Sequence, residues 1–174
     1  WWEARKIWGM LVNLSRAWSR QCLTLLKPSE LQDVTELRRM QHSLVYRHLA
    51  FVVALRVYLR KENPHALENA DEIIMAYNKF HELEGFLSEK EYQFIQSCNN
   101  APNMLLQMQG EKLLKAYNSG WISDYRWMQM DKTLVEFNHI QGKCERIKNT
   151  PLPRGYSFFQ RLFIYIHATL LPFT

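Results

Sequence analysis

The chain has 174 residues, of which 47% are hydrophobic and 22% are charged, and its formal net charge is +5. This composition excludes a disordered chain and suits a single domain with a hydrophobic core. The positive charge is mild, so it permits acidic partners such as lipid headgroups or nucleic acid without indicating either.

The first expected helix covers residues 2–26. Its apolar side chains recur at alternating spacings of three and four, which places them on one helical face. They are Ala4, Ile7, Leu11, Leu14, Trp18, Cys22 and Leu25. Pro28 ends this helix, and Ser29-x-x-Gln32 predicts a capping box at the start of the next.

The second expected helix covers residues 29–61. Its apolar face consists of Leu37, Leu44, His48, Val52, Leu55 and Leu59. Residues 49–55 (LAFVVAL) are apolar on every side, but seven residues cannot cross a bilayer, which needs roughly twenty. We therefore expect this stretch to be nearly fully buried in a central core helix. His48 is expected to be a packed, hydrogen-bonded core histidine, with a metal ligand as the alternative.

Shorter elements are expected in the middle of the chain, before one more long helix. An amphipathic pattern covers residues 66–80, Ser88-x-x-Glu91 predicts a helix start, and Pro102 suits the first turn of another helix. Asn118-Ser-Gly120 should close that helix. The next helix should run over 123–148 on a face made of Trp127, Met130, Leu134, Phe137, Gln141 and Cys144. The expected fold is an all-α helical bundle, in which helices 2–26, 29–61 and 123–148 are the longest.

Both ends of the chain have features of membrane helices. Tryptophans beside cations, as in the opening WWEARK, are typical of the cytoplasmic surface of a bilayer. Four later cations mark the same side before the chain becomes apolar: Lys143, Arg146, Lys148 and Arg154. Pro151 and Pro153 break the long helix, and residues 162–173 are then apolar except for His167 and Thr169. Twelve residues reach about 18 Å as a helix, which is half of a membrane span.

We therefore expect two parts: a cytosolic helical domain over residues 1–157, which includes the end of a membrane helix, and the start of a transmembrane helix over residues 158–174. The residues expected at the membrane surface are Trp1, Trp2, Arg5, Lys6, Arg154 and Arg161. The alternative is a soluble bundle with a buried C-terminal helix.

The sequence contains no recognisable catalytic motif. It lacks HExxH, GxGxxG, GxxxxGK[ST] and GxSxG, and of its two ExxH pairs only Glu136 with His139 suits a helical face. A catalytic site and a bound cofactor or metal are therefore not expected. The three cysteines are widely spaced, which argues against a disulfide framework. Five arginines share no single exposed face, so nucleic acid is not an expected partner: Arg38, Arg39, Arg47, Arg56 and Arg60.

Two stretches carry a family resemblance. The opening WWEARKIWGMLVNLSR and the later CERIKNTPLPRGYSFFQRLFIYIHATLLPF resemble the bacterial branch of the bestrophin family, homopentameric ion channels with four membrane helices per subunit. The resemblance implies that this chain runs from the end of the second membrane helix to the start of the third, in the bacterial inner membrane. It implies passive conduction of chloride or monovalent cations. The calcium-binding segment of the eukaryotic members has no counterpart here.

The resemblance also implies a pore constriction. In the family, one apolar side chain per subunit forms a cytosolic aperture just before the third membrane helix, and the matching motif here points to Leu152. Pro151 and Pro153 would stiffen the turn, so that five copies form a hydrophobic ring, which gates by excluding water. The alternative is that Leu152 packs under the turn.

Two other functions stay open on the sequence alone. One is a soluble helical scaffold or interaction domain without catalytic activity. The other is a helical enzyme with a metal site built from residues that include Glu136, His139 and His48.

Overall fold

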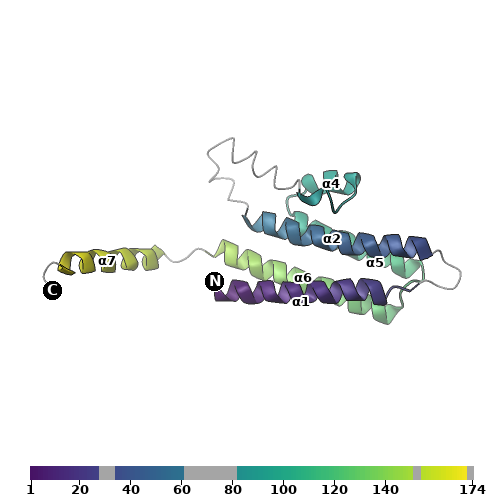
Figure 1. Cartoon of the computed structure of the whole chain (residues 1–174), viewed down its shortest axis with the longest axis horizontal. Coiled ribbons are helices and arrows are strands. Elements are labelled where there is room, and N and C mark those ends of the chain that lie inside the picture. Colours follow the sequence, from purple (N-terminus) through teal and green to yellow (C-terminus); the bar gives the residue numbers. More distant parts are fainter. Residues whose placement is uncertain (28–33, 61–81, 151–153, 172–174) are drawn as a thin grey trace.

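The computed structural model describes residues 1–27, 34–60, 82–150 and 154–171, with side chains from residue 158 onward in the last segment. These residues form six α-helices and include no β-strand, which confirms the all-α prediction. The helices are α1 (Trp2–Thr24), α2 (Val34–Arg60), α4 (Glu89–Gln96), α5 (Ala101–Asn118), α6 (Asp124–Asn149) and α7 (Arg154–Leu170). Figure 1 shows α1, α2, α5 and α6 in an elongated bundle, with α7 beyond one end of it.

The three longest helices all belong to the bundle. They are α1, α2 and α6, with 23, 27 and 26 residues, as predicted. The most extensive packing is between α2 and α5, followed by α6 against both α1 and α5. At the centre, Trp18 meets Phe137 edge-on with ring centroids 6.3 Å apart, and both side chains are completely buried. Edge-to-face pairs of this kind add to the stabilisation from burial.

Local capping residues set the helix ends where they were expected. The Glu91 carboxylate accepts hydrogen bonds from the backbone N–H and the hydroxyl of Ser88, at 3.2 and 2.9 Å. Pro102 lies in the first turn of α5, and Gly120 follows the end of that helix with a φ of 72°. This left-handed conformation favours glycine, because a Cβ would strain the backbone there.

The prediction that residues 49–55 are nearly fully buried is wrong in part. Ala50, Phe51, Ala54 and Leu55 are inaccessible to solvent, but Leu49 is 41% exposed. The reason is that the helices packed against α2, mainly α5 and α1, leave the face with Leu49 open to solvent. An apolar run identifies a helix that packs well, but the neighbouring helices decide which of its faces are covered.

Some expectations fall outside the described residues: the helix at 66–80, the capping box at Ser29-x-x-Gln32, and the turn with Pro151, Leu152 and Pro153. α7 begins at Arg154, before the expected boundary at residue 158. In the described part of the chain, none of the helices has the length and apolar character to cross a membrane.

Candidate functional site

One end of the bundle brings three helices together through charged side chains. Arg146 on α6 forms an ion pair with Glu3 at the start of α1. The Lys148 ammonium donates a hydrogen bond to the Tyr58 backbone carbonyl on α2, at 2.8 Å, and lies 5.2 Å from the centroid of the Tyr58 ring. The start of α1 is therefore held beside the ends of α2 and α6.

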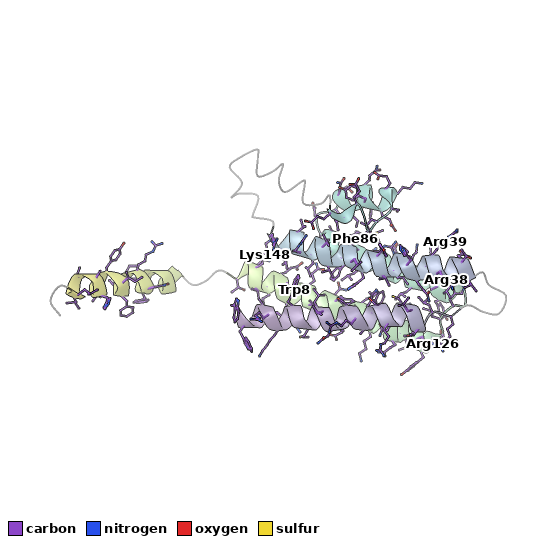
Figure 2. The ribbon with its side chains drawn as sticks, viewed as in Figure 1. Trp8, Arg38, Arg39, Phe86, Arg126 and Lys148 are labelled. Carbon is purple, nitrogen blue, oxygen red and sulfur yellow. The ribbon has the colours of Figure 1, made fainter. Side chains whose placement is uncertain are left out.

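We call this region the aromatic–basic end. Its defining residues are Trp1, Trp2, Arg5 and Lys6 at the start of α1, Tyr58 and Arg60 on α2, and Arg146 and Lys148 on α6. α7 lies beyond the same end (Figure 1). Figure 2 shows Lys148 here, and Arg38 and Arg39 toward the opposite end of the bundle.

Two pairs of a tryptophan and a cation stand on the first turns of α1. The Arg5 guanidinium lies 4.8 Å from the centroid of the Trp1 ring, and the Lys6 ammonium lies 5.4 Å from that of Trp2. Both pairs follow from the four-residue spacing, which places side chains next to each other on a helix. The rings remain 85% and 63% exposed. Exposed rings that carry cations suit the boundary between apolar and charged surroundings.

The described side chains of α7 and of the residue after it, residues 158–171, are all exposed. The large apolar ones are Phe158, Phe159, Leu162, Phe163, Ile164, Tyr165, Ile166, Leu170 and Leu171. Because water does not favour so much exposed apolar surface, this helix needs an apolar environment or a protein partner.

The residues predicted for the membrane surface are only partly brought together. Trp1, Trp2, Arg5 and Lys6 form one half of the aromatic–basic end, while the exposed Arg161 lies on α7. Arg154 begins α7, but its side chain lies outside the described set. The bundle's last helix adds Arg146 and Lys148 to this end, and the sequence prediction had placed both on the cytoplasmic side. Lys148 and Arg146 precede the proline-rich turn, and their positions near a helix end were the available signal.

His48 lies in the core, as expected. Its Nε2 is 2.9 Å from the Ser15 hydroxyl oxygen, and that hydroxyl donates to the Leu11 carbonyl at 2.7 Å. The imidazole therefore carries its proton on Nε2 and donates it to Ser15. The ring also packs on Phe137, with centroids 4.6 Å apart. Burial lowers the pKa of His48 from 6.5 to about 4, so the ring is neutral at physiological pH.

The metal site that includes His48 is not assembled. His48 is buried between α1, α2 and α6, whereas His139 lies on an exposed face of α6 with Glu136 3.7 Å away. Across residues 1–27, 34–60, 82–150 and 154–171, no three side chains of His, Cys, Asp or Glu gather as metal ligands would. Burial also raises the pKa of the Cys22 thiol to about 12, which makes it a poor nucleophile.

A partly buried ion pair joins α4 to the bundle, and sequence reasoning missed it. Arg47 on α2 is 3% exposed and pairs with Glu91 on α4, while its Nη1 donates to the Met108 carbonyl on α5 at 3.5 Å. Burial alone would raise the pKa of Glu91. The charge of Arg47 and hydrogen bonds from Ser88 and Arg47 outweigh burial and lower the pKa. No local pattern links residues so far apart in the sequence, so this contact had no signal.

Comparison with known proteins gives a consistent result. A family profile described as "Bacterial/Fungal Bestrophin protein" matches residues 1–174. The chain is 31% identical over 171 residues to the voltage-dependent anion channel-forming protein YneE of Escherichia coli, a match that covers 98% of this chain and 48% of that protein. It is 29% identical over 172 residues to a voltage-dependent anion channel-forming protein of a Nostoc species, covering 99% and 50%.

The fold is also similar to solved structures. A crystal structure of a bacterial bestrophin homolog from Klebsiella pneumoniae matches with a TM-score of 0.77 and 26% sequence identity, covering 98% of this chain and 55% of that one. The chain thus spans about half the length of the relatives that it matches.

Proposed function

Because this chain belongs to the bacterial and fungal bestrophin family, we propose that it is the cytosolic part of an ion-channel subunit that conducts small anions, chloride among them. Conduction is passive and involves no catalytic step. The family match over residues 1–174 is the observation that carries this proposal, and the names of the relatives in Escherichia coli and Nostoc favour anions over cations.

In this proposal the aromatic–basic end lies at the cytosolic surface of the bacterial inner membrane. Residues 1–157 form the cytosolic domain together with the end of one membrane helix, and residues 158–174 begin another. Two features support this placement: the exposed tryptophans with their cations, and the exposed apolar surface of α7 beyond the same end. Cationic residues are enriched on the cytoplasmic side of membrane helices, which gives the orientation.

The subunit is proposed to assemble as a homopentamer around the pore. A pore on a symmetry axis needs ring-closing contacts between identical subunits. The outer sides of α1 and α6 expose large apolar residues that could take part: Trp8, Val12, Met128 and Val135. The measurement is the mass of the full-length protein in detergent. A monomer or dimer would contradict the ring.

Leu152, between Pro151 and Pro153, is proposed to form the cytosolic aperture. A ring of leucines forces an ion to shed part of its water, so a smaller side chain should widen and wet the constriction. Leu152→Ala in the full-length channel should raise conductance or relax discrimination by ion size. Leu162→Ala, which removes the same atoms from α7, should leave discrimination unchanged. If Leu152→Ala alters neither property, this leucine is a turn residue outside the pore.

The function itself is tested with purified full-length protein in planar bilayers. Under a chloride gradient with an impermeant cation, the reversal potential should move toward the chloride equilibrium potential. A reversal potential that follows a sodium or potassium gradient would instead make the channel cation-selective. Absence of any current above that of protein-free bilayers would favour a scaffold without transport activity.

A further inference from the structure

We infer that the aromatic–basic end binds the headgroups of anionic lipids. This inference rests on the proposed placement of that end at the membrane surface, and it adds the chemical class of lipid that the end prefers. The structural feature that leads to it is an excess of cations without carboxylate partners at the point where three helix ends meet.

The carboxylates near this end are already engaged. Glu3 pairs with Arg146, and Glu82 pairs with Arg56 on the last turns of α2. Glu145 accepts a hydrogen bond from Gln141 at 2.8 Å. The remaining cations have no carboxylate partner within the part of the chain that the structure describes. They are Arg5, Lys6, Arg60 and Lys148.

These cations come from three different helices but are grouped at one end of the bundle. Arg5 and Lys6 stand on the first two turns of α1, Arg60 ends α2, and Lys148 is next to the end of α6. The contacts of Arg146 with Glu3 and of Lys148 with Tyr58 hold these ends side by side. Charges grouped in this way add their potentials, because charges within about 10 Å of each other are only partly screened at physiological salt.

The tryptophans orient two of the cations for lipid. A cation that stacks on an aromatic ring uses one face or one N–H group for that contact. Its other N–H groups stay free to donate to a phosphate oxygen. Trp1 and Trp2 would sit among the headgroups and first acyl carbons, which holds Arg5 and Lys6 at the depth of the lipid phosphate. A zwitterionic headgroup brings its own cation to this surface, whereas an anionic one does not, so the end should prefer anionic lipid.

Two of these cations also have a structural role. Arg60 and Lys148 lie at the C-terminal ends of their helices, where a positive charge complements the helix dipole. Arg5 and Lys6 are at the start of a helix and have no such role. Substituting these two residues therefore separates lipid binding from helix stability.

The test uses full-length protein reconstituted in vesicles that contain brominated lipid, which quenches nearby tryptophan fluorescence. The wild-type protein should be quenched by brominated phosphatidylglycerol at a lower mole fraction than by brominated phosphatidylcholine. Each cation near an anionic surface contributes about fivefold to binding. In the Arg5→Gln/Lys6→Gln variant, the preference for phosphatidylglycerol over phosphatidylcholine should therefore fall by roughly tenfold or more.

The matched control is Arg38→Gln/Arg39→Gln, an exposed basic pair toward the other end of the bundle. It removes the same charge and should keep the wild-type preference. Equal quenching by both lipids in wild-type protein, or an equal loss in both variants, would overturn the inference. Displacement of the lipid by millimolar glycerol phosphate would also overturn it, because the end would then be a site for free phosphate.

The outcome is distinguishable from failure of the channel proposal. Anion current with no lipid preference would reject only the lipid inference. Lipid preference without anion current would reject only the proposed transport function. Circular dichroism should show equal helix content in all three proteins, and a lower content in Arg5→Gln/Lys6→Gln alone would assign these cations to stability and overturn the inference.

Discussion

The burial of His48 predicts that the bundle loses stability as the pH falls. In the folded chain, burial lowers the pKa of His48 to about 4, whereas an ordinary histidine has a pKa of 6.5. Between these two values the unfolded chain binds a proton that the folded chain excludes. The free energy of unfolding must therefore decrease on acidification through this window.

The magnitude follows from the difference between the two pKa values. Each pH unit of difference corresponds to about 1.4 kcal/mol, so the full effect is about 3 kcal/mol. The stabilisation is fully present above about pH 6.5 and is lost progressively as the pH falls toward 4. Domains are typically stable by about 5–15 kcal/mol, so one residue would remove a substantial part of the total.

The packing around the ring explains why this cost is large. His48 is 2% exposed and lies against the rings of Phe51 and Phe137. Its Nε2 proton already goes to Ser15. A second proton would create a buried charge, and the described residues place no carboxylate where it would raise the pKa. An unpaired buried charge is energetically unfavourable, so protonation of His48 shifts the folding equilibrium toward the unfolded chain.

The assay is thermal unfolding of the full-length protein in detergent, followed by circular dichroism at several pH values. For a domain of 174 residues, about 3 kcal/mol corresponds to a shift in Tm of roughly 10 °C, and the longer full-length protein should show a smaller shift in the same direction. His48→Gln keeps an N–H donor for Ser15 but does not titrate, so its Tm should fall less on acidification. The control is His139→Gln, which removes an exposed histidine from α6 and should behave as wild type. If His48→Gln and wild type lose Tm equally, His48 is not the titrating group.

Three further predictions concern stability. Glu91→Gln leaves the buried Arg47 without its carboxylate partner and should cost about 3 kcal/mol in thermal unfolding. Glu82→Gln, in an exposed pair, should cost less than about 1 kcal/mol. Equal losses would contradict the claim that burial makes the Arg47 pair the stronger one. Leu55→Asp should prevent folding because it buries an unpaired carboxylate, while Leu49→Asp, at an exposed position, should fold with unchanged helix content. If the stability of Leu55→Asp is within about 1 kcal/mol of wild type, Leu55 is not a core residue. Gly120→Ala meets no atom within 4 Å, so its cost of about 1 kcal/mol should come from backbone strain alone, and an unchanged Tm would exclude that strain.

Sequence patterns predicted the helices well because their signals are local. Alternating spacings of three and four identified the buried faces of α1 and α6, where Leu11, Trp18 and Phe137 are almost inaccessible to solvent. Ser88 and Gly120 marked a helix start and a helix end through bonds or backbone angles within a few residues. Leu49 was misjudged because its burial depends on which side of α2 another helix covers, and periodicity carries no such information.

Only part of the candidate site could be predicted from the sequence, for the same reason. The spacing of Trp1 with Arg5, and of Trp2 with Lys6, lies within one helical turn and could be recognised directly. The contribution of Lys148 depends on a contact with a residue 90 positions earlier, which only the fold brings about. The pair of Arg47 and Glu91 spans 44 positions and was missed entirely.

The proposed aperture depends on a still higher level of organisation. A helix face is encoded within one turn, and the aromatic–basic end within one folded chain, but a ring of Leu152 exists only when several chains meet on an axis. A single leucine between two prolines has no local feature that separates a pore residue from a packed turn residue. The two possibilities differ in what surrounds the side chain in the assembly. A pore residue faces the pore and the four other copies, whereas a packed turn residue is surrounded by atoms of its own subunit. The conductance of Leu152→Ala therefore reports on the assembly in a way that the stability of the isolated bundle cannot. Removing methyl groups from a ring that faces the pore costs little packing energy, whereas removing them from under a turn leaves a cavity.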